Sequence, residues 1–237
     1  MNKEEFIRNL NELNISYTDN ELTLLDKYYH YLIEYNENVN LTGITEEKDV
    51  YLKHFYDSLT IFKYLDLTKY NTLIDIGSGA GFPGVVLKIF FPNLKITLLD
   101  SNGKKTTFLT KLIEHLGLKD ITVINDRAEE YALKHLNEFD LCTSRAVAFI
   151  DIILSLSIPF VKKDGFIILM KGNIDSEKPI LEKHKDELNI KDFTINNFNL
   201  YNNDLERNIL IISKKSDTDK VLSYSNIVKR NKSWNRN

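Results

Sequence analysis

Short apolar runs alternate with amphipathic segments along the chain from residue 72 onward. Apolar runs of about four to eight residues between turn-forming residues are typical of buried strands, and the longer amphipathic segments are typical of helices. The alternation indicates βαβ units and therefore an α/β fold with a doubly wound, mostly parallel sheet. Strands are expected over 72–76, 95–99, 121–125, 139–144, 165–170, 191–198 and 207–213, with helices between them, such as 103–116 before Gly117.

The first 70 residues follow a helical pattern instead. Thr18 and Glu21 have the spacing of a capping box, which marks the start of a helix. Apolar residues then recur every three or four positions and predict one buried face, made of Leu22, Leu25, Tyr29 and Leu32. A polar break over 36–45 separates this helix from a second helical stretch over 47–65.

Three parts are therefore expected: a helical extension over 1–70 that packs on the catalytic domain, a sheet-containing catalytic domain over 71–213, and a basic tail over 214–237. The tail holds seven Lys or Arg residues and two Asp residues, a charge of +5 in a protein whose formal net charge is −3. Such a tail suits contact with phosphate groups. A solvated, partly disordered terminus is the alternative that the residues alone favour.

Composition excludes several classes of protein. No run of 18 apolar residues exists, so we expect no membrane-spanning helix, and the first residues lack the pattern of a signal peptide. The single cysteine, Cys142, excludes an internal disulfide and a Cys-rich zinc site. It lies in an apolar run, where a thiol is more often an inert core group than a nucleophile. A cytoplasmic protein without a metal is expected.

A glycine-rich turn follows the first expected strand, which ends near Asp75. Glycines allow a tight turn and let a ligand approach main-chain N–H groups at the start of the next helix. A dinucleotide loop has the pattern G-x-G-x-x-G, but Phe82 stands where its third glycine belongs. The spacing Asp75-x-Gly77-x-Gly79-x-Gly81 instead resembles motif I of class I S-adenosylmethionine (AdoMet) methyltransferases.

Asp100 ends the second apolar run, where a carboxylate can accept hydrogen bonds from both ribose hydroxyls of a cofactor. This role serves AdoMet and NAD alike. The glycine spacing favours AdoMet, and the preceding carboxylate of Asp75 suits its cationic amino group and sulfonium. An ordinary strand–helix turn is the alternative for the glycines, and a helix N-cap is the alternative for Asp100.

Further segments fit one family when they are taken together. They are Asn40-Leu-Thr42, His54-x-x-Asp57-Ser58, Asp75-Ile-Gly-Ser-Gly-Ala-Gly-Phe-Pro-Gly84, Leu98-Leu-Asp-Ser-x-Gly-Lys-Lys105, Arg127-Ala-Glu129, Ser144-Arg-Ala146 and Lys171-Gly172. In this combination the chain resembles the bacterial small-subunit ribosomal RNA guanine-N7 methyltransferases, also called glucose-inhibited division protein B. The resemblance covers most of the chain, and Asp-Ser-x-Gly-Lys, Arg-Ala-Glu and Ser-Arg-Ala together are more specific than the glycine loop.

The resemblance implies a class I AdoMet-dependent methyltransferase fold, Rossmann-like with a seven-stranded sheet, and AdoMet as the methyl donor. It implies 16S ribosomal RNA, or a small ribosomal subunit particle, as the partner of a monomeric enzyme. The implied target is N7 of a single guanine, guanine 527 in the 530 loop.

Position within the motifs implies a role for each site residue. Gly77 and Phe82 line the methionine and ribose side of the cofactor, Asp100 holds the ribose, and Ala128 and Glu129 lie beside the adenine. The whole set implied to bind AdoMet is Asp75, Gly77, Gly79, Phe82, Asp100, Ala128, Glu129 and Arg145. The candidate RNA contacts are His54, Lys104, Lys105, Lys171 and Arg207.

Guanine N7 carries an in-plane lone pair and can take a methyl group directly, so no general base is required and catalysis is mostly alignment. Arg145 is the candidate catalytic residue because its fork can grip guanine O6 or a phosphate, and a salt bridge to a strand-end carboxylate is its alternative. His54 and Asp57 are either a wall of the site or a surface pair. Phe149 either stacks on a base or, more often for such a ring, joins the core.

Three other functions stay open at this point: a methyltransferase for a small molecule or a protein, a NAD-dependent oxidoreductase, and a non-catalytic RNA-binding module. The basic tail and the Ser-Arg-Ala segment favour RNA as the substrate.

Overall fold

The computed structural model describes residues 1–201 and 205–234. The strands are β1 (Thr72–Ile76), β2 (Lys95–Asp100), β3 (Ile121–Asn125), β4 (Phe139–Arg145), β5 (Val161–Lys171), β6 (Ile190–Asn199) and β7 (Glu206–Lys214). The α-helices are α1 (Lys3–Glu12), α2 (Asp19–Asn36), α3 (Glu47–Val50), α4 (Asp57–Leu59), α5 (Gly84–Phe90), α6 (Gly103–Leu116), α7 (Ala128–Ala132), α8 (Ile150–Ser157), α9 (Lys178–Lys183) and α10 (Tyr224–Trp234). Tighter or wider turns form η1 (Tyr51–Tyr56), η2 (Thr60–Lys63), η3 (Leu67–Lys69) and η4 (Ile158–Phe160).

The strands form a seven-stranded sheet in the order β3-β2-β1-β4-β5-β7-β6. β2 with β3, β1 with β4, and β4 with β5 pair in parallel, whereas β7 runs antiparallel to both β5 and β6. The expected α/β fold with a mostly parallel sheet is confirmed, and each expected strand is present. β5 begins at Val161 instead of residue 165 because the exposed polar residues 162–164 continue the strand.

The chain divides into two compact units, which are described separately. The first unit contains Met1–Asn71 and Gly77–Asn125, and the second contains Thr72–Ile76 and Asp126–Asn237. Residues 1–71 therefore belong to the same compact unit as β2, β3, α5 and α6. The domain boundaries expected from the sequence, at 70/71 and 213/214, stay predictions.

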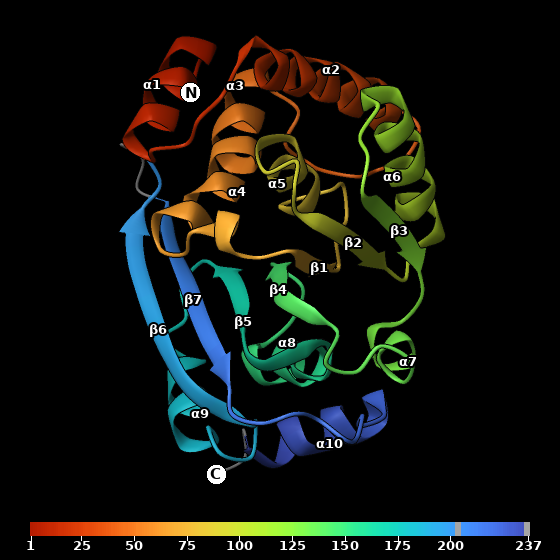
Figure 1. Cartoon of the computed structure of the whole chain (residues 1–237), viewed down its shortest axis with the longest axis vertical. Coiled ribbons are helices and arrows are strands. Elements are labelled where there is room, and N and C mark those ends of the chain that lie inside the picture. The colour runs from red at the N-terminus through yellow and green to blue at the C-terminus, as the bar shows by residue number, and fades with distance from the viewer. Residues whose placement is uncertain (202–204, 235–237) are drawn as a thin grey trace. The chain divides into compact units, whose positions relative to one another are not determined.

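Helix α2 shows how the sequence builds the first unit. Thr18 and Glu21 form the expected reciprocal capping box, and the helix packs against α5 and α6 (Figure 1). Its buried residues are Leu25, Tyr28 and Leu32. The predicted face is therefore confirmed at Leu25 and Leu32, whereas its other members, Leu22 and Tyr29, are only half-buried. Tyr28 is drawn inward because its hydroxyl donates to the main-chain oxygen of Ala80 in the glycine turn.

The helical stretch expected over 47–65 is broken into α3, η1, α4 and η2. The Ser58 hydroxyl donates to the His54 carbonyl at 2.6 Å, and the Thr60 hydroxyl donates to the Asp57 carbonyl at 2.6 Å. Hydroxyls that bond to carbonyls of the preceding turn perturb regular helices, and wide turns of the η1 kind are frequent at functional sites.

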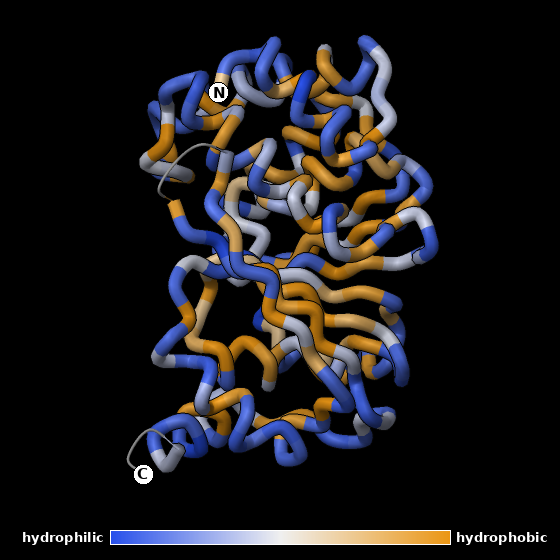
Figure 2. Tube along the Cα trace, turned by 90° about the vertical axis from the view of Figure 1, so that its left-hand side faces the viewer, coloured by the Kyte–Doolittle hydropathy of each residue, from blue (hydrophilic) through white to orange (hydrophobic). Residues whose placement is uncertain are grey.

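The second unit has a hydrophobic core along β1, β4, β5 and β7, and apolar strand segments run through the middle of Figure 2. β6 is mostly polar and exposed. Cys142 is fully buried in β4, and burial raises the pKa of its thiol to about 12. A thiol that stays protonated is a poor nucleophile. The expected inert core role of Cys142 is therefore supported.

The basic tail contains helix α10, which packs on α8 (Figure 1). Ile227 is its buried residue. The segment 224–234 is therefore a helix docked on α8 and not a disordered terminus, although most of its residues are exposed to solvent. No helix among the described residues is long and apolar enough to cross a membrane.

Replacing Gly81 by Ala is expected to lower the free energy of unfolding by about 3 kcal/mol, because it adds backbone strain and overpacking. Gly81 has φ +98°, and a Cβ atom there would lie 2.6 Å from the Tyr28 hydroxyl and 2.7 Å from Val85 Cγ2. Urea unfolding measures the change.

Gly43→Ala is the matched control, because a Cβ atom at Gly43 meets nothing within 4 Å. Its expected effect is within about 0.5 kcal/mol. Equal stability of the two variants would contradict the close packing of the turn on α2.

Candidate functional site

The turn after β1 is folded back onto the end of β2 in the first unit. Gly77, Gly79 and Gly81 have φ angles of 70°, 58° and 98°, a left-handed region that glycine adopts without strain. The Gly77 amide donates to the Leu99 carbonyl at 2.7 Å. The Gly79 amide donates to Asp100 Oδ2 at 2.9 Å. The glycine turn is therefore tied to the end of β2, and it brings the Gly79 amide to the carboxylate of Asp100.

The carboxylate of Asp100 is held from both sides. Oδ2 accepts from Gly79, as above, and Oδ1 accepts from the Asn102 amide at 2.8 Å. The Asn125 side chain donates to the Asp100 main-chain oxygen at 3.1 Å and ties β3 to the same point. Each carboxylate oxygen keeps acceptor capacity because an ionised oxygen offers about two lone pairs.

This arrangement fits the ribose end of AdoMet. A fixed carboxylate with spare lone pairs can accept from two hydroxyls. A Cβ atom at Gly79 would meet only the Gly77 carbonyl within 4 Å, at 3.8 Å, so the loop leaves space for a ligand above it. No group of three or more metal-ligating side chains was found among residues 1–201 and 205–234.

Helix α6 begins directly after Asp100. The Asn102 side chain accepts from the amides of Lys104 and Lys105 and caps the helix. Lys104 is exposed and Lys105 is half-buried, so both can reach solvent beside the carboxylate. Their predicted contacts with phosphate stay predictions.

An aromatic stack supports the glycine turn from behind. The Phe82 ring lies between Tyr28, with ring centroids 5.3 Å apart, and His54, with ring centroids 4.3 Å apart. His54 Nε2 and the Thr42 hydroxyl are hydrogen-bonded at 2.9 Å. His54 is only 7% exposed. Burial leaves His54 little surface to offer RNA, and its ring packs on Phe82. Its predicted contact with RNA and its role as a wall of the site stay predictions.

Sequence reasoning missed Tyr28, which touches both Phe82 and the Ala80 carbonyl. Its spacing from Leu25 and Leu32 on α2 could have identified Tyr28, but the predicted apolar face included the neighbouring Tyr29 instead. Thr42 was present in the motif set without a role.

In the second unit, Asp75 and Arg145 mark the ends of neighbouring parallel strands. Asp75 is fully buried and stands opposite Thr143 of β4. Arg145 is the last residue of β4 and is half-buried. The next residue, Ala146, has φ 54°, so the chain turns sharply at the end of the strand.

The loop after Arg145 exposes apolar side chains. Val147 is 43% exposed and Phe149 is 39% exposed. The core position favoured for Phe149 is therefore wrong, because the ring sits at the N-cap of α8, outside the packed interior. A base-stacking role for Phe149 stays a prediction.

Lys171 is engaged within the protein. Its ammonium lies 2.5 Å from Glu177 Oε2, with both side chains about nine-tenths buried, and it also donates to the Ala148 carbonyl at 3.0 Å. A phosphate would have to compete with Glu177, so the geometry makes Lys171 a support of the loop after Arg145. Arg207 is half-buried and donates to the Glu206 carbonyl at 3.0 Å.

The Arg-Ala-Glu segment forms a short internal ion pair. Glu129 is 6% exposed, and its Oε1 accepts from Arg127 Nε at 2.5 Å. This contact raises the pKa of the Arg127 guanidinium. Ala128, between them, begins α7 and is half-buried. Sequence reasoning gave Arg127 no role of its own.

Solved structures share the fold. The YcgJ protein of Bacillus subtilis superposes with a TM-score of 0.58 at 12% identity, over 69% of this chain and 100% of that one. TYW2 of P. horikoshii in complex with MeSAdo superposes with a TM-score of 0.51 at 12% identity, over 62% of this chain and 58% of that one. At such identities the likeness concerns the fold alone.

Sequence relatives are much closer. The ribosomal RNA small subunit methyltransferase G of Bacillus subtilis (strain 168) is 43% identical over 223 residues, which cover 93% of each chain. The protein of the same name from Bacillus velezensis is 44% identical over 93% of each chain. The family described as GidB, rRNA small subunit methyltransferase G, matches residues 21–210. The chain therefore belongs to the GidB family of rRNA small subunit methyltransferases G.

Proposed function

We propose that this protein transfers the methyl group of AdoMet to N7 of a single guanine in small-subunit ribosomal RNA, guanine 527 of the 530 loop. The observation that carries the proposal is the Gly79–Asp100 contact, which forms a ribose-type site inside a chain that matches the GidB family over residues 21–210. The relatives are named as ribosomal RNA small subunit methyltransferases, which supports this substrate.

The cofactor residues follow from the motifs and the local geometry. Asp100 binds the ribose hydroxyls, and the turn made by Gly77 and Gly79 presents main-chain groups to the cofactor. Phe82 follows that turn, and its ring packs on Tyr28 and His54. The other residues assigned to the cofactor are Asp75, Ala128 and Glu129, and Arg145 is assigned to the junction of cofactor and substrate.

When bound, AdoMet supplies a methyl group on a positively charged sulfur, which the guanine N7 lone pair takes by displacement without loss of a proton. The protein then has to align the base rather than remove a proton, and alignment can contribute about 7–11 kcal/mol. The product base is cationic, so a cation placed directly at N7 would oppose the reaction. Arg145 is therefore assigned to guanine O6 or an adjacent phosphate.

We assign the protein to the cytoplasm as a monomer, with ribosomal RNA or the small ribosomal subunit as its partner. Lys104 and Lys105 are the proposed phosphate contacts in the first unit. Lys171 and His54 contribute indirectly, through the loop after Arg145 and through Phe82.

The test supplies AdoMet with a labelled methyl group together with 16S ribosomal RNA or with small subunits, and then maps the modified nucleotide. Label at N7 of one guanine is the expected result. Label on an exocyclic amine or on protein would overturn the assignment. Titration with NAD in place of AdoMet tests the oxidoreductase alternative, for which we expect no binding.

The basic tail is expected to contribute phosphate contacts through Lys229 and Lys232, which are exposed on α10. The double variant Lys229→Gln/Lys232→Gln should weaken RNA binding and lower the salt slope by about 1.4 to 1.8. Filter binding at several salt concentrations measures both quantities.

Lys95→Gln/Lys119→Gln is the matched control, because these exposed lysines lie at the amino ends of β2 and β3, away from the edge where parallel sheets bind ligands. An unchanged slope in the α10 variant, or an equal change in the control, would show that α10 makes no phosphate contact.

A further inference from the structure

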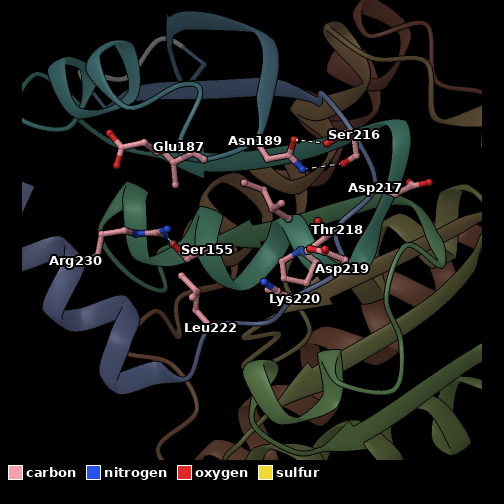
Figure 3. A pocket seen from close by; sticks show the side chains of 13 residues that line it. Ser155, Glu187, Asn189, Ser216, Asp217, Thr218, Asp219, Lys220, Leu222 and Arg230 are labelled. Atoms are coloured by element: carbon pink, nitrogen blue, oxygen red, sulfur yellow. Dashed lines mark hydrogen bonds between the residues drawn. The ribbon is translucent and has the colours of Figure 1, made fainter.

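Helix α10 is anchored to the second unit along its length. The Arg230 guanidinium donates to the Ser155 hydroxyl of α8, as Figure 3 shows, and Asn231 donates to Asp151 Oδ2 at 2.5 Å. The Trp234 ring stacks on His184 with ring centroids 3.9 Å apart. These contacts hold the C-terminal half of α10 against the second unit, and Tyr224 is the first residue of the same helix.

A cavity of about 330 Å³ lies beside the contact between α8 and α10. Ser155 of α8 and Arg230 of α10 are among the residues that line it. Burial lowers the pKa of Arg230, which agrees with its inward direction. The cation that the sequence counted as part of a basic tail is thus used to dock the helix and not to meet solvent.

At the other end of α10, Tyr224 lies against Arg127. The guanidinium carbon of Arg127 is 4.9 Å from the centroid of the Tyr224 ring, a distance typical of a cation–π contact. Arg127 in turn bonds the buried Glu129, as described above. The Tyr224 ring, the Arg127 guanidinium and the Glu129 carboxylate thus contact one another in turn, a series that links α10 to α7.

Glu129 depends on this series because a buried carboxylate is costly without a partner. Helix α7 is five residues long and has no side-chain N-cap, so the Arg127–Glu129 pair adds to the main-chain hydrogen bonds that hold its first turn. The Arg127 side chain is 54% exposed, and without the ring beside it Glu129 would be the contact left to restrict its rotation. Tyr224 covers one face of the guanidinium and restricts that rotation.

We propose that Tyr224 is a positioning residue of the cofactor site, which holds Arg127 against Glu129 and so keeps the first turn of α7 in place for the adenine of AdoMet. The proposal rests on the proposed function, in which Ala128 and Glu129 lie beside the adenine. It gives the C-terminal segment a part in cofactor binding that is separate from any contact with RNA.

Tyr224→Ala is expected to raise the Kd for AdoMet about two- to five-fold, the effect of losing an exposed cation–π contact. Tyr224→Phe retains the ring and should bind as the wild type does. The kcat at saturating AdoMet and the KM for RNA should not change in either variant. Calorimetric titration with AdoMet and steady-state kinetics separate these quantities.

A second measurement needs no ligand. In the ligand-free protein, the amides of Glu130 and Tyr131 bond the Arg127 carbonyl, and they should exchange hydrogen faster in Tyr224→Ala than in Tyr224→Phe. Leu222→Ala is the control, because Leu222 is 38% exposed in the same segment and does not take part in the series. It should leave both the exchange and the Kd unchanged.

The variant Arg127→Met tests whether Tyr224 acts on the cofactor site through Arg127. If Tyr224 acts through Arg127, Tyr224→Ala adds no further loss of affinity in the Arg127→Met background. An equal fold-change in both backgrounds, or wild-type affinity and exchange in Tyr224→Ala, would overturn the proposal. A wild-type protein that binds no AdoMet would instead refute the proposed function.

Discussion

Replacing Asp100 by Ala is expected to weaken AdoMet binding by at least about 100-fold, because two charge-assisted hydrogen bonds of about 1.5–3 kcal/mol each are lost. The loss has a second cause in the structure. The Gly79 amide bonds Asp100 Oδ2, so the variant also releases the turn that lies over the cofactor. Calorimetric titration with AdoMet measures the affinity.

Asp100→Asn separates the two causes. The amide can still accept one hydrogen bond, but its NH₂ group would meet either the Gly79 or the Asn102 amide, both of which are donors. We expect an affinity between those of the wild type and Asp100→Ala.

Asp49→Asn is the control, because Asp49 forms an exposed pair with Lys53 in the same unit. It should bind AdoMet as the wild type does. A Kd for Asp100→Ala within about three-fold of wild type would mean that the carboxylate does not hold the ribose.

Most strands could be predicted because each is an apolar run bounded by turn residues, and this signal is local; the mostly polar β6 is the exception. The broken helix over 47–65 could not, since it results from the hydroxyls of Ser58 and Thr60 bonding to nearby carbonyls. The predicted face of α2 included Tyr29 instead of Tyr28 because two neighbouring tyrosines cannot be told apart by the apolar pattern, and Leu22 at its start is only half-buried. Only the contact of Tyr28 with Ala80, far along the chain, selects between the two tyrosines.

The site was predictable to the same extent. Gly77, Gly79 and Asp100 carry the signal in their spacing, and the structure joins two of them directly. The ammonium of Lys171 looked available in the sequence, but its pairing with Glu177 depends on the fold. The contact between Tyr224 and Arg127 joins residues almost a hundred positions apart, and no local pattern encodes such a pair.

Arg145→Ala is expected to lower kcat for methyl transfer about 100-fold and to change the Kd for AdoMet by less than about three-fold. A bidentate contact with a base contributes about 1–3 kcal/mol, and loss of alignment in the reacting complex adds to that. Single-turnover kinetics with RNA and calorimetric titration with AdoMet measure the two effects separately.

Arg145→Lys is the matched variant, because it keeps the charge at the end of β4 and loses the planar fork. If Arg145 acts on guanine O6, the lysine variant should restore little of the rate. If it acts on a phosphate, the lysine variant should restore most of it, since an ammonium binds phosphate as a point charge. A loss of AdoMet affinity equal to the loss of rate would instead place Arg145 at the cofactor. The result therefore shows whether Arg145 contacts the guanine base, a phosphate of the RNA or the cofactor.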